Sequence, residues 1–344
     1  MAEWKKTTLE KCTDILGDGL HGTPKYTEGG EYAFINGNNL VNGEILIKKD
    51  TKRVDYSQYE KYKKPLTNRT LLVSINGTLG NVGMYNSEKI ILGKSACYFN
   101  VKEFVDKDFI YYVVSSPIFR QYLEHSATGT TIKNISLKQM REYDFLLPPI
   151  EEQKQISSVL KMIDEKIKNN RRVNENLEQQ AQAIFANMFD ESNTTQATIS
   201  DVSLNVTDGV HNTVHDDPEG EYLLLSCKNI KGGSLNIGTS ERRISRDTFE
   251  KLRRRTKLSK GDVLISSVGT IGELLLLNNE PLNYEFQRSV AMVKPNPSVV
   301  SSAYLYESLL SNRAKLINSA HGAVQQCLFI SDIFTLSESL LSPY

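Results

Sequence analysis

A chain of 344 residues is longer than one hydrophobic core usually serves, so we expect two domains and a connector. Hydrophobic residues make up 39% and charged residues 24%, which excludes a disordered chain. No apolar run approaches the roughly 20 residues of a membrane helix, and the first residues are charged. We therefore expect a cytoplasmic protein with no membrane span. The 41 basic and 41 acidic residues cancel, which counts mildly against nucleic-acid binding if only the total is considered.

The four cysteines are predicted to be structural. Cys12, Cys97, Cys227 and Cys327 stand far apart and form no Cys-x-x-Cys pair. This spacing indicates neither a disulfide framework nor a zinc site. We expect them to be buried as small apolar residues, and we expect no metal site in the chain.

The first 150 residues are predicted to form a mixed α/β domain. Residues 70–75 are apolar and rich in β-branched side chains, and Gly-Thr-Leu-Gly follows at 77–80, which predicts a strand closed by a turn. Residues 109–124 have the apolar spacing of a helix, which we expect to pack on the sheet.

A long helical spacer is predicted after Pro148 and Pro149. Residues 151–189 contain neither Gly nor Pro, and a 4-3-4-3 spacing predicts a coiled-coil seam. The seam comprises Ile156, Leu160, Ile163, Ile167, Asn170, Asn174, Leu177, Ala181, Ile184 and Met188. Amides buried at Asn170 and Asn174 would cost stability but fix the register. Such a helix of 39 residues (189 − 151 + 1) would be roughly 58 Å long and would lie outside both cores.

The first domain recurs after the spacer. Asp-Gly-Val-His-Asn-Thr-Val at 208–214 echoes Asp-Gly-Leu-His-Gly-Thr-Pro at 18–24, an offset of 190 (208 − 18). Val-Leu-Ile-Ser-Ser-Val-Gly-Thr-Ile-Gly at 263–272 echoes Leu-Leu-Val-Ser-Ile-Asn-Gly-Thr-Leu-Gly at 71–80, an offset of 192 (263 − 71). Such ordered matches indicate two copies of one domain. We expect a first domain at 1–150, a spacer at 151–190 and a second domain at 191–344, with a strand at 262–266 and a helix at 303–317.

A cationic segment occupies the same place in both copies. Residues 48–69 hold eight basic and three acidic residues, and residues 241–260 hold nine basic and three acidic residues. Either segment alone is equally well explained as a solvated surface, but its recurrence favours contact with DNA phosphates. The candidate DNA-binding residues are Lys52, Arg53, Lys63, Lys64, Arg243, Arg253, Arg254 and Arg255, together with Thr78 and Thr270 of the Gly-Thr-x-Gly turns.

Several motifs resemble those of a known family. Leu-Leu-Pro-Pro-Ile-Glu-Glu-Gln-Lys-Gln-Ile at 146–156, Gly-Thr-Thr-Ile-Lys-Asn-Ile-Ser at 129–136 and the duplicated Asp-Gly-x-His and Gly-Thr-x-Gly elements resemble specificity subunits of Type I restriction-modification systems. The resemblance covers essentially the whole chain. It implies two tandem target-recognition domains that each recognise half of a bipartite site on double-stranded DNA, joined by a helix that docks methyltransferase subunits.

The same resemblance implies further partners. Restriction subunits would complete the complex, and S-adenosylmethionine, ATP and Mg²⁺ would serve the partner subunits, with no cofactor in this chain. The family normally carries a second long helix after its second domain, whereas this sequence stops at Tyr344. We therefore expect the seam to pair with the same helix of a second copy or with a methyltransferase subunit.

Catalytic residues are not predicted. Asp18 with His21, and Asp208 with His211, resemble acid-base pairs or metal ligands, but no nucleophile or third ligand lies nearby, so a structural or DNA-facing His is favoured. The Gly-Thr-x-Gly turns lack the Gly-Lys-Ser/Thr ending of a P-loop. A non-catalytic coiled-coil adaptor with two globular heads remains an alternative, although it does not explain the matching basic segments.

Overall fold

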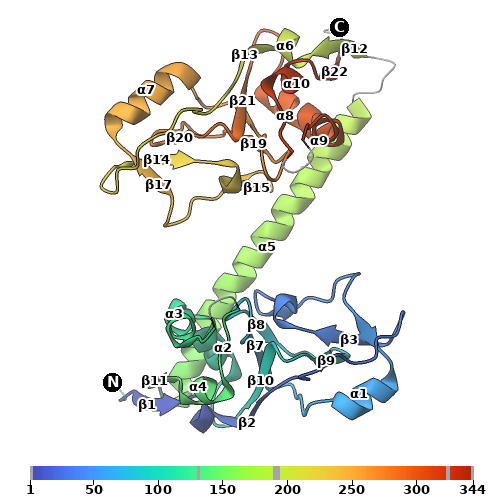
Figure 1. Ribbon diagram of the computed structural model, residues 1–344, viewed down its shortest axis with the longest axis vertical. Coiled ribbons are helices and arrows are strands. Elements are labelled where there is room, and N and C mark those ends of the chain that lie inside the picture. The colour runs from blue at the N-terminus through green and yellow to red at the C-terminus, as the bar shows by residue number, and fades with distance from the viewer. Residues whose placement is uncertain (1–2, 130–131, 189–193, 323–325, 342–344) are drawn as a thin grey trace. The chain divides into compact units, whose positions relative to one another are not determined.

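The computed structural model describes residues 3–129, 132–188, 194–322 and 326–341. The chain divides into two compact units, Met1–Asn170 and Arg171–Tyr344 (Figure 1). The division falls inside the long helix α5 (Ile150–Met188), so each unit contains part of that helix. None of the described helices is both long enough and apolar enough to cross a membrane.

The first unit is built on an antiparallel four-stranded sheet. Its order is β2 (Thr13–Asp18), β10 (Ala96–Val101), β7 (Thr70–Ser74) and β8 (Val82–Met84). A smaller sheet has the order β6 (Arg53–Val54), β3 (Tyr32–Ile35) and β9 (Ile90–Leu92). Two further pairs are β1 (Lys5–Thr8) with β11 (Asp144–Leu147), and β4 (Leu40–Val41) with β5 (Glu44–Ile45). The helices are α1 (Tyr56–Tyr62), α2 (Lys107–Ser115), α3 (Pro117–Ser126) and α4 (Leu137–Glu142).

Strand β7 is buried on both faces, which explains its uninterrupted apolar sequence. Leu71 and Val73 join a core that includes side chains of α2, α3 and α4, whereas Leu72 joins a second core with side chains of β3 and β9. Accordingly, the helices cover one face of the sheet and the smaller sheet covers the other (Figure 1). The predicted strand is confirmed, although it ends at Ser74.

The second unit repeats this plan element by element. Its strands are β12 (Thr194–Thr198), β13 (Ser203–Asp208), β14 (Tyr222–Leu225), β15 (Ile230–Lys231), β16 (Ser234–Leu235), β17 (Arg242–Ile244), β18 (Val263–Ser266), β19 (Leu274–Leu276), β20 (Tyr284–Phe286), β21 (Val290–Pro295) and β22 (Ser337–Leu341). The large sheet has the order β13-β21-β18-β19, and the smaller one β17-β14-β20. The helices are α6 (Ile199–Val202), α7 (Arg246–Thr256), α8 (Ser302–Ser311), α9 (Arg313–Asn318) and α10 (Ile330–Phe334). In β18, Val263 and Ile265 face the core shared with α8 and α9, and Leu264 faces the other core.

Both predicted sheet-covering helices are in fact helix pairs. The helix predicted at 109–124 breaks at Ser116, which is extended and caps α3 by accepting a hydrogen bond from the Phe119 amide, with Pro117 as the first helical residue. The helix predicted at 303–317 is interrupted at Asn312, between α8 and α9.

The cysteine prediction is half right. All four thiols are free; Cys12 and Cys97 are buried, but Cys227 and Cys327 are partly exposed. Cys227 begins a 3-10 turn and Cys327 lies in a bridge between loops, so neither sits on a strand with two covered faces.

The long helix is not a spacer throughout its length. At its start, Gln153 and Ser157 are buried and Ile156 packs against the helix-side core of the first unit. Further along, the Tyr112 hydroxyl donates to Asp164 at 2.9 Å, and Lys161 and Lys168 form ion pairs with Asp108 and Glu44. The helix therefore contacts the first unit largely through polar side chains.

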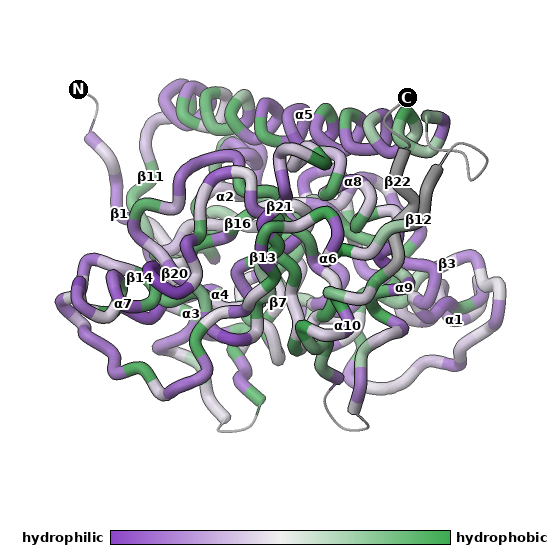
Figure 2. Tube along the Cα trace, turned by 90° about the horizontal axis from the view of Figure 1, so that it is seen from above, coloured by the Kyte–Doolittle hydropathy of each residue, from purple (hydrophilic) through white to green (hydrophobic). Residues whose placement is uncertain are grey.

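Beyond Leu160 the predicted seam of α5 is exposed, apart from half-buried Ala181. Ile163 and Ile167 are 51% and 43% exposed in the first unit. In the second unit, Phe185 packs on Tyr304 with ring centroids 5.3 Å apart, while Leu177, Ile184 and Met188 are exposed. Leu160 is half-buried, and Asn170 and Asn174 are exposed. Apolar positions recur between hydrophilic ones along the helix (Figure 2).

A buried ion pair anchors α7 to β20. The Arg253 guanidinium pairs with Glu285, whose side chain is fully buried, and also donates to the carbonyls of Pro281 and Tyr284. Burial raises the pKa of the Glu285 carboxyl, and the Arg253 charge and the Thr256 hydroxyl oppose that shift. The pair is therefore needed to compensate a charge that water does not reach.

We predict that Arg253→Ala destabilises the second unit by about 3–5 kcal/mol, because it leaves the Glu285 carboxylate buried without a counter-charge. Arg254→Ala is the matched control, since the Arg254 side chain is 81% exposed. Urea unfolding followed by circular dichroism reports on both units, and fluorescence of Trp4, the one tryptophan, reports on the first, so a shift seen by circular dichroism alone belongs to the second unit. Equal effects of the two substitutions would contradict the prediction.

Candidate nucleic-acid interface

The predicted cations of the first unit lie around β6 and α1. Lys52 is exposed, and Lys64 is half-buried; neither ammonium group has a hydrogen-bond partner among the described residues. Lys63 forms an ion pair with Glu60 at 2.8 Å, at the carboxyl end of α1. This contact raises the pKa of Lys63, so the ammonium group stays charged but is already paired with a carboxylate.

The predicted cations of the second unit have different surroundings. Arg254 is exposed on α7, 3.7 Å from Glu250. Arg255 donates to the carbonyls of Asp208 and Gly209, which ties α7 to the Asp-Gly-x-His loop. Arg253 is committed to the buried pair with Glu285. The three consecutive arginines therefore have three different environments, because successive helical positions point about 100° apart.

Arg53 and Arg243 occupy equivalent positions and make the same contact. The Arg53 guanidinium donates to the carbonyl of Gly30 at 3.3 Å, and the Arg243 guanidinium donates to the carbonyl of Gly220 at 2.9 Å. Both contacts close the turn that precedes β3 or β14. A shared role in loop structure therefore explains why both copies carry an arginine at this position.

The Gly-Thr-x-Gly turns join β7 to β8 and β18 to β19. Gly77, Gly80, Gly269 and Gly272 all have positive φ, which favours glycine. Thr78 and Thr270, the predicted contacts, are exposed between them. The Gly77 amide donates to the carbonyl of Lys133, so this turn lies beside the loop that follows α3.

The Asp-Gly-x-His loops follow β2 and β13. A Cβ on Gly19 would lie 2.2 Å from the Leu92 carbonyl oxygen, and one on Gly209 would lie 2.1 Å from the Phe286 carbonyl oxygen. Only glycine allows this approach, which fixes each loop against the end of β9 or β20. Imidazole Nε2 lies 2.5 Å from an Asp Oδ2 in both pairs, His21 with Asp18 and His211 with Asp208.

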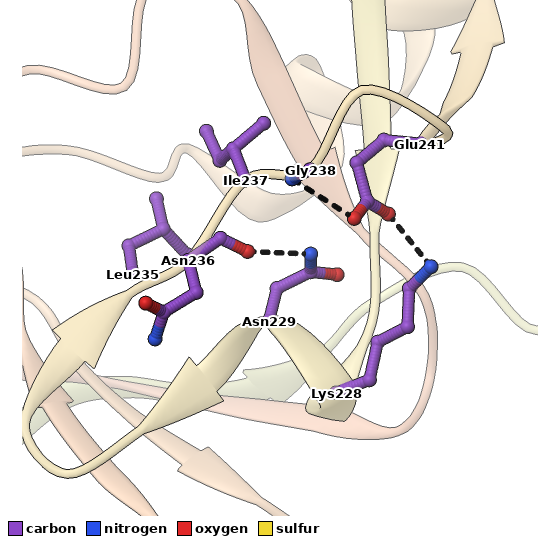
Figure 3. A pocket seen from close by; sticks show the side chains of 7 residues that line it. All are labelled: Lys228, Asn229, Leu235, Asn236, Ile237, Gly238 and Glu241. Carbon is purple, nitrogen blue, oxygen red and sulfur yellow. Dashed lines mark hydrogen bonds and ion pairs between the residues drawn. The ribbon is translucent and has the colours of Figure 1, made fainter. Parts of the chain in front are cut away.

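Two hollows open on the second unit. The larger, about 540 Å³, is lined by Lys228, Asn229, Leu235, Asn236, Ile237, Gly238 and Glu241 (Figure 3). Its polar groups satisfy one another: Lys228 pairs with Glu241 at 2.9 Å, and the Asn229 amide donates to the Asn236 carbonyl at 2.8 Å. Burial alone would raise the pKa of Glu241, but the contacts from Lys228, Asn229 and Gly238 hold it below its usual value.

This larger hollow is a product of loop structure. In the first unit the Asn39 amide donates in the same way to the Leu46 carbonyl at 2.9 Å. The asparagine therefore holds the same loop in both units.

The second hollow, about 350 Å³, adjoins the Asp-Gly-x-His loop. It is lined by Val210, His211, Asn212, Thr213, Val214, Leu224, Arg242, Gln287 and Arg288. Sequence reasoning missed Gln287 and Arg288 because they lie outside the basic segment. Ser95 and Ser289, which follow Lys94 and Arg288, each accept a hydrogen bond from the first amide of a 3-10 turn, so aligning the copies at an offset of 194 (289 − 95) would have found them.

Comparison with known proteins identifies the family. The model of the Type I restriction modification DNA specificity domain matches residues 1–179, which is 179 of the 344 residues. The chain belongs to this family.

Curated relatives agree with this assignment. The Type I restriction enzyme EcoBI specificity subunit of Escherichia coli is 22% identical over 335 residues, covering 86% of this chain and 69% of its own length. The MjaIX specificity subunit of Methanocaldococcus jannaschii is 25% identical over 195 residues, covering 54% of this chain. The chain spans only 44% of that relative's length.

A solved structure shares the fold. The S subunit of the Type I restriction-modification system from M. genitalium superposes with a TM-score of 0.56 at 18% identity, covering 99% of this chain and 85% of that one. At this identity the likeness establishes the mixed α/β fold with its long central helix and two domains.

Proposed function

We propose that this chain is the DNA-reading subunit of a Type I restriction-modification complex in the cytoplasm, and that each unit recognises one half of a bipartite target on double-stranded DNA. The observation that carries the proposal is the duplicated scaffold, which holds different exposed polar side chains at equivalent positions. Family membership supports it. An adaptor with two globular heads would need no such matched loops.

The chain's own part is recognition. The two Asp–His pairs lie on loops with exposed imidazoles, and among the described residues no three His, Cys, Asp or Glu side chains gather as metal ligands. Methyltransferase and restriction subunits would carry out the chemistry, with S-adenosylmethionine, ATP and Mg²⁺ as their requirements. We accordingly assign no catalytic residue.

Bipartite recognition predicts two separate sequence elements. Methylation mapping of DNA from cells that express this chain with its companion methyltransferase should return two different half-sites separated by an unspecified spacer, because the two units present different side chains. Protection mapping of the assembled methyltransferase should show two separate patches. One continuous element in both measurements would contradict the proposal.

Phosphate contacts would supply affinity without sequence information. Lys52, Lys64 and Arg254 have the charge and freedom for this role, because none is committed to a carbonyl or a buried carboxylate. Lys63 and Arg255 would contribute more weakly, since both are already engaged. We assign Arg53, Arg243 and Arg253 to holding the loops and α7 in place.

We predict that Arg254→Gln weakens binding to all DNA sequences and lowers the salt dependence of affinity by about one unit on a log–log scale. Lys138→Gln is the control, because Lys138 lies on α4 with a side chain equally exposed at 81%. Titration of duplex DNA at several salt concentrations gives both slopes. An unchanged slope for Arg254→Gln, and also for Lys52→Gln with Lys64→Gln, would remove both segments from the interface.

The exposed seam of α5 is proposed as a docking surface for a helix of the methyltransferase subunit. Helices usually turn apolar side chains toward their own protein. Beyond its first turns, however, α5 contacts the first unit through Asp164, Lys161 and Lys168 and leaves Ile163 and Ile167 in water. Covering a large apolar side chain is worth about 1.5–3 kcal/mol when it is fully exposed beforehand. A partner helix that covers the seam would be stabilised by this free energy at each such side chain.

We predict that Ile163→Asp with Ile167→Asp abolishes co-purification with the methyltransferase subunit, because each carboxylate would be buried in the interface. Lys166→Asp, on the same exposed stretch, should have little effect. Light scattering on the purified chain distinguishes self-association. A dimer that these substitutions dissolve would assign the seam to a second copy, and undiminished capture of the methyltransferase would refute the proposed docking.

A further inference from the structure

Several polar side chains that line the hollow beside His211 make no hydrogen bond to any described residue. Arg242 is held by Asp216 at 2.7 Å and by the Val214 carbonyl, and His211 is held by Asp208. The side chains of Asn212, Thr213, Gln287 and Arg288 make no hydrogen bond to any described residue. The walls are therefore fixed, and the hydrogen-bonding groups that they carry are available to a ligand.

The backbone beneath these side chains is rigid. The Val210 amide donates to the Phe286 carbonyl at 3.0 Å, and the Arg288 amide donates to the Val210 carbonyl at 3.1 Å. Arg255 adds its contacts to the carbonyls of Asp208 and Gly209. Rigid support keeps side chains at a fixed place, which sequence readout requires.

Free amides favour a base edge over a phosphate. A phosphate offers only acceptors, so the carbonyl oxygen of Asn212 or Gln287 would remain unpaired against it. A purine edge in the major groove offers adenine N6 as donor with N7 as acceptor, or guanine O6 and N7 as two acceptors. An amide matches the first pattern, and the guanidinium of Arg288 matches the second.

The first unit has the same loops but not this chemistry. Its equivalent positions carry Gly22, Gly93 and Lys94 in place of Asn212, Gln287 and Arg288. A Cβ on Gly93 would lie 2.2 Å from Asn36 Oδ1, whereas the second unit has the smaller Ser226 at the place of Asn36. The exchange of Asn36 for Ser226 thus removes the side chain that occupies this space in the first unit.

We propose that this hollow is a base-reading site of the second unit, which receives purine edges of the major groove, with Gln287 and Asn212 contacting an adenine and Arg288 contacting a guanine. The proposal rests on the function proposed above and specifies which residues of one unit determine its half-site. His211 positions the loop through Asp208.

Methylation mapping in cells that express the chain with its companion methyltransferase tests this site. Gln287→Ala and Arg288→Ala should each reduce discrimination at one or two base pairs of a single half-site roughly tenfold or more, and leave the other half-site intact. The intact half-site shows that the complex has assembled. Lys138→Ala, which removes an exposed cation on α4 outside the hollow and outside the proposed phosphate contacts, should leave both half-sites unchanged.

A conservative variant separates base contact from phosphate contact. Arg288→Lys keeps the charge but loses the paired donors, so it should relax specificity at the same base pair. A silent Arg288→Lys together with a silent Gln287→Ala would overturn the proposal, since a phosphate contact needs only charge. If the unaltered chain directs methylation to no defined half-sites, the proposed function itself fails. Unchanged half-sites in a triple Asn212→Ala, Gln287→Ala, Arg288→Ala variant would overturn only the base-reading site.

Discussion

The close approach of one glycine to a strand end organises each unit. Gly19 lies so close to the Leu92 carbonyl, and Gly209 so close to the Phe286 carbonyl, that a Cβ on either glycine would clash with the carbonyl oxygen. This contact joins the loop after β2 or β13 to the smaller sheet, and so connects the two layers on that side of the unit. The His residue, the turn after β9 or β20 and the hollow beside it all take their positions from this contact.

The two units share these loop contacts but carry different exposed side chains. Paired residues such as Asn39 and Asn229 hold the same loop in both, and Arg53 and Arg243 close the same turn. The side chains that face water differ, because substitutions there cost little stability whereas changes in the frame create clashes or unpaired polar groups. A fold in which buried contacts hold the loops can therefore change its exposed side chains without losing its structure.

The long helix α5 also uses different side chains for its contacts with the first unit and for its exposed surface. Its contacts with the first unit are largely ion pairs and hydrogen bonds, so its apolar seam is free for another molecule. Ion pairs at a surface add little stability. The helix is therefore held to the first unit mainly by its buried first turns around Gln153 and Ser157. Ile163 and Ile167, further along, remain exposed to water.

The sequence by itself determined the repeat, the long helix and the strands β7 and β18, because these depend on periodicity and on local turn chemistry. It also located the cationic segments. Only the tertiary structure decided which cations are free: Arg253, Arg254 and Arg255 are adjacent in sequence, yet one is paired with buried Glu285, one is exposed and one holds the Asp-Gly-x-His loop. No local sequence pattern marks Gln287 and Arg288 as site residues. They line the hollow only because a backbone bridge joins them to the Asp-Gly-x-His loop, which is about 75 residues away in sequence. Contacts between distant segments determine burial and pairing, and no local pattern encodes them.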